Sequence, residues 1–197
     1  MYLIDSHTHV YLPEFADDRK VVVERAREQG VELMFLPAID SSTHDVMMEV
    51  ERLFPQCRAM MGLHPCSVKP DYNRELDIIK DHLSKRNFIA IGEIGLDFYW
   101  DKTHVKQQFE AFHQQIELAL SHALPIVIHS RNAVDECIEV VSGYPGLKGV
   151  FHCFSGNVDQ ARKILDLDFL LGIGGVVTFK NSGLDKVIEI TGIDRVI

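Results

Sequence analysis

The feature that most constrains the fold of this chain is a regular alternation between short apolar runs and amphipathic stretches. The apolar runs are continuous, as in residues 88–92 and 125–128, and the stretch 105–120 carries its apolar side chains on one helical face. Strands that are apolar without alternation are typical of sheets buried on both faces, and such sheets are parallel and covered by helices. The sequence therefore predicts an α/β protein.

The rhythm of the sequence predicts seven strands and seven helices. Strands are expected from residue 3 and at 31–39, 58–63, 88–92, 125–128, 149–151 and 168–173. Helices are expected at 21–29, 46–54, 76–83, 105–120, 134–141, 161–165 and 184–190. Caps are expected from Gly30 at the end of the first helix and from residues 41–43 at the start of the second.

Residues of the kind that bind metal ions follow the predicted strands. His7 and His9 are one residue apart, so in an extended segment their side chains project from the same face about 7 Å apart. The full set comprises His7, His9, His64, Glu93, His129 and His152. These residues come from strands one, three, four, five and six.

The spread of these ligands decides between an open doubly wound sheet and a barrel. Strand ends so far apart in order do not generally converge in an open sheet, whereas in a barrel they surround one site at the carboxyl face. We therefore expect a (β/α)8 TIM-type barrel that forms a single domain over residues 1–197, which is large enough for a substantial core.

Composition bounds the setting of the protein. Hydrophobic residues make up 46% of the chain and charged residues 25%, as in ordinary globular proteins. No apolar run is long enough to span a bilayer, and no basic and hydrophobic leader precedes the first strand, so we expect a cytoplasmic protein without membrane partners. The four cysteines have no paired spacing and are expected to be reduced thiols, with Cys153 packed in the core.

Residues 194–197 resemble the opening of an eighth strand, at which point the sequence stops. A barrel without that strand would expose the edges of strands one and seven, which are templates for aggregation. We therefore expect that strand eight has been cut off and that the sequence comes from a longer chain. An intact mass equal to 197 residues would contradict this expectation.

Five ordered motifs resemble the TatD family of metal-dependent hydrolases, which are similar to amidohydrolase-type barrels. The motifs span residues 4–9 (Ile-Asp-Ser-His-Thr-His), 62–65 (Gly-Leu-His-Pro), 92–97 (Gly-Glu-Ile-Gly-Leu-Asp), 125–131 (Pro-Ile-Val-Ile-His-Ser-Arg) and 152–156 (His-Cys-Phe-Ser-Gly). The resemblance implies a deoxyribonuclease with a divalent-metal site. It also implies a Thr-Asp pair on strand eight, which this sequence lacks, so the chain as written is expected to be impaired or inactive.

The resemblance also implies the roles of the ligands. His7 and His9 would hold one ion, His129 and His152 the other, and Glu93 would bridge them because a carboxylate has two oxygens. Two divalent ions would provide a hydroxide that attacks phosphorus and would neutralise charge on the phosphoryl oxygens. Mixed nitrogen and oxygen ligands leave zinc, manganese and magnesium open.

Three further residues are candidates with alternative readings. His64 is expected to contact a substrate phosphate or a further ion, or else to cap the chain before Pro65. Arg131 would bind phosphate bidentately or form a surface ion pair. Asp97 would orient a ligand histidine or cap the following helix. Tyr99 and Trp100 could stack on bases, although core packing is favoured.

Three functions stay open at this stage. The first is hydrolysis of phosphodiesters, most simply of DNA, and the second is hydrolysis of an ester or amide such as an aminoacyl-tRNA by the same ions. The third is an inactive metal-binding scaffold. The formal net charge of −9 argues against a broad basic groove, so DNA or a small phosphodiester is expected to bind weakly.

Overall fold

All strands of the computed structural model, which describes residues 2–197, pair in parallel. One sheet has the order β1-β2-β3, and its strands are Leu3–Asp5, Val31–Leu36 and Cys57–Ala59. The other has the order β4-β5-β6-β7, and its strands are Ile91–Asp97, Ile126–Arg131, Gly149–Phe151 and Leu170–Leu171. The predicted parallel α/β architecture is confirmed.

The order of the strands within each sheet follows their order in the chain without a reversal. This order is typical of a barrel, whereas the strand order of a doubly wound sheet reverses. A bridge between Met61 and Ile91 connects the two sheets. Beyond β7, Val196 forms a parallel bridge with Leu171, which agrees with the strand-like character expected of residues 194–197.

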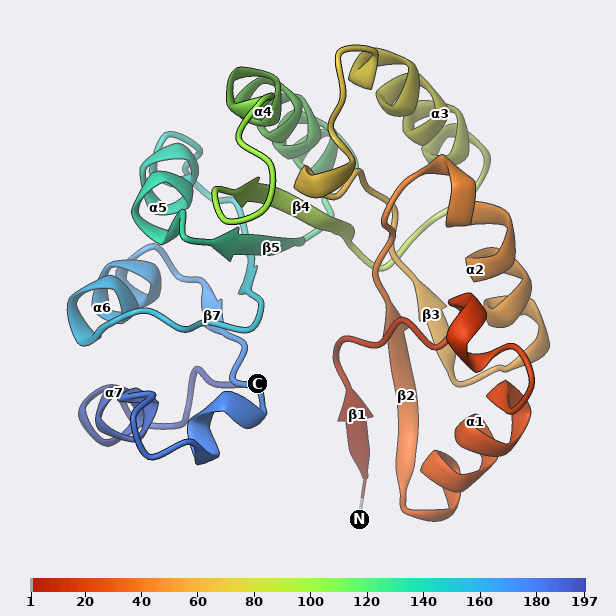
Figure 1. The fold of residues 1–197 in the computed structure, drawn as a ribbon, viewed down its shortest axis with the longest axis horizontal. Coiled ribbons are helices and arrows are strands. Elements are labelled where there is room, and N and C mark those ends of the chain that lie inside the picture. The colour runs from red at the N-terminus through yellow and green to blue at the C-terminus, as the bar shows by residue number, and fades with distance from the viewer. Residues whose placement is uncertain (1) are drawn as a thin grey trace.

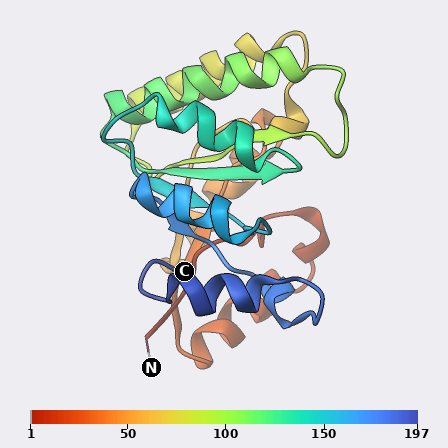
Figure 2. The same ribbon diagram turned by 90° about the vertical axis from the view of Figure 1, so that its left-hand side faces the viewer.

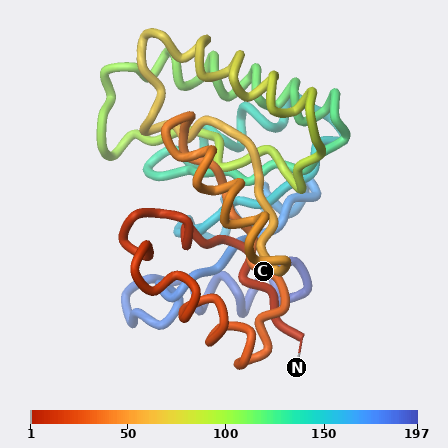
Figure 3. Tube along the Cα trace, turned by 90° about the vertical axis from the view of Figure 1, so that its right-hand side faces the viewer, coloured from red at the N-terminus to blue at the C-terminus, as the bar shows by residue number. Residues whose placement is uncertain are grey.

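Among residues 2–197, α1 to α6 connect consecutive strands and α7 follows β7. The helices lie outside the strands, as Figures 1, 2 and 3 show from three sides. They are α1 Arg19–Glu28, α2 Ser41–Leu53, α3 Tyr72–Lys85, α4 Val105–Ser121, α5 Val134–Ser142, α6 Val158–Asp166 and α7 Leu184–Thr191. Short 3-10 helices cover Pro13–Phe15, Pro65–Ser67 and Gly175–Thr178. Among residues 2–197, no helix has the length and apolar character needed to cross a membrane.

Local signals explain several helix boundaries. Gly30 follows α1 with a φ of 88°, a left-handed conformation that glycine adopts without strain. The cap of α2 is Asp40, whose side chain accepts a hydrogen bond from the Ser42 amide, so the prediction of a cap at residues 41–43 is wrong by one position. Asn157 and Gln160 form a reciprocal capping box at the start of α6.

The core lies between the strands and the inner faces of the helices. Every residue of β4 is buried, as expected for a strand covered on both sides. On α4, Phe112 and Ile116 are fully buried, but Leu120 is 43% exposed although it was expected on the same face. Ala119, three residues after Ile116, takes the buried position in the last turn because the apolar face drifts with the 3.6-residue period.

Candidate metal centre

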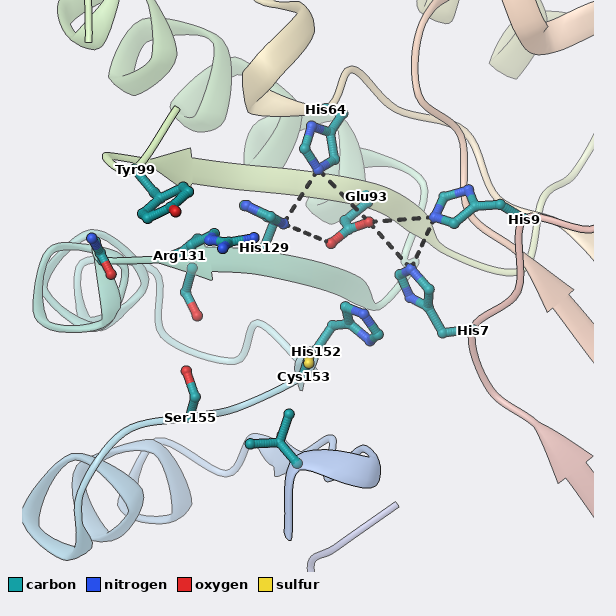
Figure 4. Close-up of a pocket in the computed structure, with 13 residues that line it drawn as sticks. His7, His9, His64, Glu93, Tyr99, His129, Arg131, His152, Cys153 and Ser155 are labelled. Atoms are coloured by element: carbon teal, nitrogen blue, oxygen red, sulfur yellow. Dashed lines mark hydrogen bonds and ion pairs between the residues drawn. The ribbon is translucent and has the colours of Figure 1, made fainter. Parts of the chain in front are cut away.

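A pocket of about 680 Å³ lies where the carboxyl ends of the strands converge. Its lining includes all six ligand candidates of the sequence together with Arg131 (Figure 4). The ligand candidates are His7, His9, His64, Glu93, His129 and His152. Asp97 is fully buried and lies against His129. The structure therefore brings together residues that the sequence separates by more than 140 positions.

Two of these residues were expected to follow their strands, but the structure places them inside the strands. Glu93 is the third residue of β4 and His129 the fourth of β5. The ladder between these strands continues through Gly95–His129 and Asp97–Arg131. Backbone pairing therefore carries both strands beyond their apolar runs, with polar side chains turned into the pocket.

The carboxylate of Glu93 is the centre of the site, since four imidazole rings surround it (Figure 4). The Nε2 atom of His7 lies 3.2 Å from Oε2, and the Nε2 atoms of His9 and His64 each lie 3.9 Å from the same oxygen. On the other side, Nδ1 of His129 lies 3.1 Å from Oε1.

These contacts divide into two convergent groups that share Glu93. One consists of His7, His9 and Glu93, and the other of His64, Glu93 and His129. His152 belongs to neither group; its ring stacks on that of His7 with centroids 3.4 Å apart. The resemblance implied that His152 is the partner of His129, whereas in the structure His64 lies beside His129.

Hydrogen bonds behind two of the rings fix which nitrogen faces Glu93 as an acceptor. The hydroxyl of Tyr11 donates to the Pro37 carbonyl at 2.6 Å, so it accepts from Nδ1 of His9 at 2.9 Å. Nε2 of His129 donates to Oδ2 of Asp97 at 2.8 Å, because an ionised carboxylate only accepts. In their neutral forms, His9 therefore presents the lone pair of Nε2 to the site, and His129 that of Nδ1.

His64 has the opposite arrangement. Its Nδ1 accepts a hydrogen bond from the Cys66 amide at 3.1 Å, so the neutral ring carries its proton on Nε2. This N–H lies 3.2 Å from Nδ1 of His129. His64 therefore presents a hydrogen-bond donor to the site, while its other nitrogen caps the 3-10 helix Pro65–Ser67. Both sequence readings of His64, as a site residue and as a cap, describe its position.

Burial and charge set the protonation of the site. Burial, with smaller effects of neighbouring rings, lowers the pKa of His9, His64 and His152 to about 4. Burial opposes ionisation of Glu93, but hydrogen bonds with His129 and His7 hold its pKa well below the usual range. Burial also lowers the pKa of His129, yet the hydrogen bonds to Glu93 and Asp97 raise it overall. The site at neutral pH thus combines the Glu93 carboxylate with the unprotonated imidazoles of His9, His64 and His152, whereas His129 between two carboxylates holds a proton more readily.

This donor set fits divalent metal ions. Metal ligands must be deprotonated, and His9, with its lowered pKa, and Glu93 meet that condition near neutral pH. Tyr11 and Asp97 form hydrogen bonds with the outer nitrogens of His9 and His129. In metal sites, hydrogen bonds of this kind to the outer nitrogen orient imidazole ligands. The Nε2 atom of His7 faces Glu93 and His9, and its Nδ1 atom is buried without a hydrogen-bond partner among residues 2–197.

Asp97 takes one of the two roles that the sequence left open, because it contacts His129 but does not cap the following helix, which begins at Val105 after His104. One oxygen accepts from His129, and the other accepts from the backbone amides of Tyr99 and Trp100 at 2.9 Å each. Gln108 on α4 holds the main chain of Asp97 in turn, accepting from its N–H at 2.9 Å and donating to its carbonyl. These bonds place Asp97 beneath the pocket.

Some residues of the site were missed or misread in the sequence. Tyr11 was missed; it lies in a turn closed by the hydrogen bond from the Leu12 amide to the His9 carbonyl, and its hydroxyl contacts the His9 ring. Cys153 is exposed at the pocket and not packed in the core as expected, and it has a φ of 46°. Tyr99 and Trp100 are 51% and 67% exposed, so the expectation of core packing is wrong for both.

Known proteins share the sequence and fold of this chain. The chain is 34% identical over 186 residues, 93% of its length, to an uncharacterized metal-dependent hydrolase, YabD of Bacillus subtilis, of which the match covers 73%. It is 29% identical to the 3′-5′ ssDNA/RNA exonuclease TatD of Cronobacter turicensis, over 93% of this chain and 70% of that protein.

A solved structure shares the architecture. The crystal structure of YjjV, a TatD homologue from Escherichia coli, superposes with a TM-score of 0.92 at 28% identity and covers 99% of this chain and 77% of that one. The TIM-barrel-like fold expected from the sequence is therefore confirmed. The model of the TatD related DNase family matches residues 4–197. This chain belongs to the TatD related DNase family.

Proposed function

We propose that the protein is a metal-dependent hydrolase that cleaves phosphodiester bonds of nucleic acids with two divalent ions. The observation that carries this proposal is that the buried carboxylate of Glu93 lies between two groups of imidazoles. Membership of the TatD related DNase family supports the reaction class.

Each ion would have its own ligands and share Glu93. His7 and His9 would hold the first ion through their Nε2 atoms, and His129 would hold the second through Nδ1. His152, which lies beside His7 in the same pocket, would complete the second set as the family resemblance implies. When bound, such a pair of ions activates water and neutralises negative charge on the phosphoryl oxygens.

The remaining polar groups would position the ligands and the substrate. Asp97 and Tyr11 keep His129 and His9 in the tautomers whose lone pairs face Glu93. His64 would donate its Nε2–H to a phosphoryl oxygen, because its other nitrogen is occupied by the Cys66 amide. This donor would hold the scissile group against the ions and stabilise charge that develops on it.

Nucleic acid is the substrate that we favour. A relative carries the name 3′-5′ ssDNA/RNA exonuclease, and Arg131 adds a cationic group to the pocket lining. The net charge of −9 makes a long cationic track implausible, so we expect weak, distributive binding with a shallow dependence on salt.

Cleavage of a single-stranded oligonucleotide labelled at its 5′ end tests the proposal. Protein that carries the Thr-Asp pair implied by the family resemblance, reconstituted with zinc, manganese or magnesium, should produce a ladder of products shortened from the 3′ end. EDTA and the Glu93→Ala substitution should each abolish the ladder, whereas Glu117→Ala, at an exposed position on α4, should not. Metal-loaded protein that leaves DNA and RNA intact but hydrolyses a carboxylic ester or amide would overturn the proposal.

A further inference from the structure

Two aromatic rings and one guanidinium form a cluster at the edge of the pocket. Tyr99 and Trp100 follow β4, and Arg131 is the last residue of β5. The guanidinium carbon of Arg131 lies 4.0 Å from the ring centroid of Tyr99 and 5.4 Å from that of Trp100. Figure 4 shows Arg131 and Tyr99 side by side in the pocket that also contains the ligand histidines. We call these three residues the mouth cluster.

Arg131 has an unused hydrogen-bonding capacity. Among residues 2–197, no carboxylate forms an ion pair with its guanidinium and no acceptor receives a hydrogen bond from it. The cation–π contact with Tyr99 holds the guanidinium over the ring and uses none of its N–H donors in a hydrogen bond. A planar fork of free donors matches the oxygens of a phosphate, which it binds bidentately.

The cluster is held at a fixed position relative to the metal ligands. Asp97 accepts hydrogen bonds from the backbone amides of Tyr99 and Trp100 with one oxygen and from His129 with the other. His129 and Arg131 are two residues apart on β5, so their side chains project from one face about 7 Å apart. Successive phosphates of an extended nucleic-acid strand are separated by a similar distance.

We propose that the mouth cluster is a subsite for the nucleotide next to the scissile bond. Arg131 binds the phosphate of that nucleotide, and the exposed ring of Trp100 offers a stacking face for its base. The inference rests on the proposed function, because it assigns the scissile phosphate to the histidine and glutamate centre. With one phosphate at that centre and the next at Arg131, the protein should bind a ligand with two successive phosphates more tightly than a ligand with one.

The test compares ligands that differ only in phosphates and that contain no phosphodiester to cleave. Thymidine 3′,5′-bisphosphate carries two phosphates spaced as in a strand, and thymidine 5′-monophosphate and 3′-monophosphate carry one. Affinity for the metal-loaded protein is measured by calorimetry. Trp100 is the only tryptophan of the chain, so its fluorescence reports on the cluster alone.

The bisphosphate should bind at least tenfold more tightly than either monophosphate and should change the Trp100 emission, since a charge-assisted bidentate contact contributes at least that factor. Arg131→Gln should reduce the advantage to less than about threefold, and Arg131→Lys should have an intermediate effect because lysine keeps the charge but lacks the fork. Arg27→Gln is the matched control, on the exposed surface at the end of α1.

The outcomes separate the subsite from the proposed function. An advantage of the bisphosphate that Arg131→Gln leaves unchanged, or the lack of any advantage in the natural protein, overturns the subsite even if DNA is cleaved. An advantage that depends on Arg131 supports the subsite even if no nucleic acid is cleaved, in which case the proposed reaction fails. Circular dichroism of each variant shows that the fold is intact.

Discussion

The chemistry of single residues in this site depends on which nitrogen of each imidazole carries a proton. Tyr11 and Asp97 accept from the outer nitrogens of His9 and His129, so both rings turn lone pairs toward Glu93. The Cys66 amide donates to the outer nitrogen of His64, so that ring turns an N–H inward. His9 and His64, whose Nε2 atoms each lie 3.9 Å from Glu93, thus turn different groups toward the site, which sequence spacing alone does not reveal.

The shared carboxylate of Glu93 leads to a prediction on metal content. Glu93→Ala should remove both ions, because each proposed ligand set loses its only carboxylate oxygen, whereas His9→Ala should remove one. Metal analysis by mass spectrometry after desalting measures the stoichiometry, with exposed Glu117→Ala as the control that keeps two ions. Equal loss of both ions in the Glu93 and His9 variants would refute the shared ligand.

The tautomer of His64 leads to a second prediction. His64→Ala should keep the full metal content, since its inward nitrogen is a donor, but cleavage of an oligonucleotide should fall on the order of 100-fold through loss of that donor. Metal analysis and cleavage rates on the same preparation separate the two effects. A variant that lacks one ion would make His64 a ligand.

At the scale of secondary structure, the sequence predicted the order and type of the elements better than their ends. The apolar runs at 88–92 and 125–128 located β4 and β5, but the ladder continues to Asp97 and Arg131. Polar residues after an apolar run resemble a loop, and only pairing with the neighbouring strand keeps them extended. The same limit hid the exposure of Trp100, because an aromatic residue is ordinarily assigned to the core.

The interface of α2 and α3 contains a buried histidine that makes stability dependent on pH. His44 is 1% exposed, its ring lies 5.4 Å from that of His82, and neither of its nitrogens has a hydrogen-bond partner among residues 2–197. Burial, and then the charge of His82, lower the pKa of His44, while Glu75, the Gly62 backbone and Asp40 oppose this effect. The folded protein therefore keeps His44 neutral at pH values where the unfolded chain binds a proton.

The sign of the effect follows from proton binding. Below the ordinary histidine pKa of about 6.5 the unfolded state takes up more protons, so the free energy of unfolding decreases as the pH falls. Between pH 7.5 and 5.5, the free energy of unfolding of His44→Leu should decrease by about 1 kcal/mol less than that of the natural protein. Thermal or urea unfolding of metal-free protein measures this difference, with exposed His122→Leu as the control. Parallel pH profiles for the natural and His44→Leu proteins would contradict the assignment.

At the scale of the whole molecule, the site lies where the two sheets meet. His7, His9 and His64 follow strands of the first sheet, whereas Glu93 and His129 belong to the second. A barrel was expected because ligands on strands this far apart converge only in such an architecture, and the sequential order of the strands agrees. Ions bound between these side chains would therefore tie together segments that the backbone joins near Met61 and Gly92.

Metal removal should consequently destabilise the whole fold and not only the pocket. An ion present at 100 times its dissociation constant adds about 2.7 kcal/mol to the free energy of unfolding. For a chain of this size that corresponds to a melting temperature about 5–10 °C higher than in EDTA. Thermal unfolding followed by circular dichroism measures the shift, which should increase with metal concentration and vanish in Glu93→Ala because that variant lacks the ligand shared by both sets. A natural protein that melts at the same temperature with and without metal would show that the two sheets hold together independently of the ions.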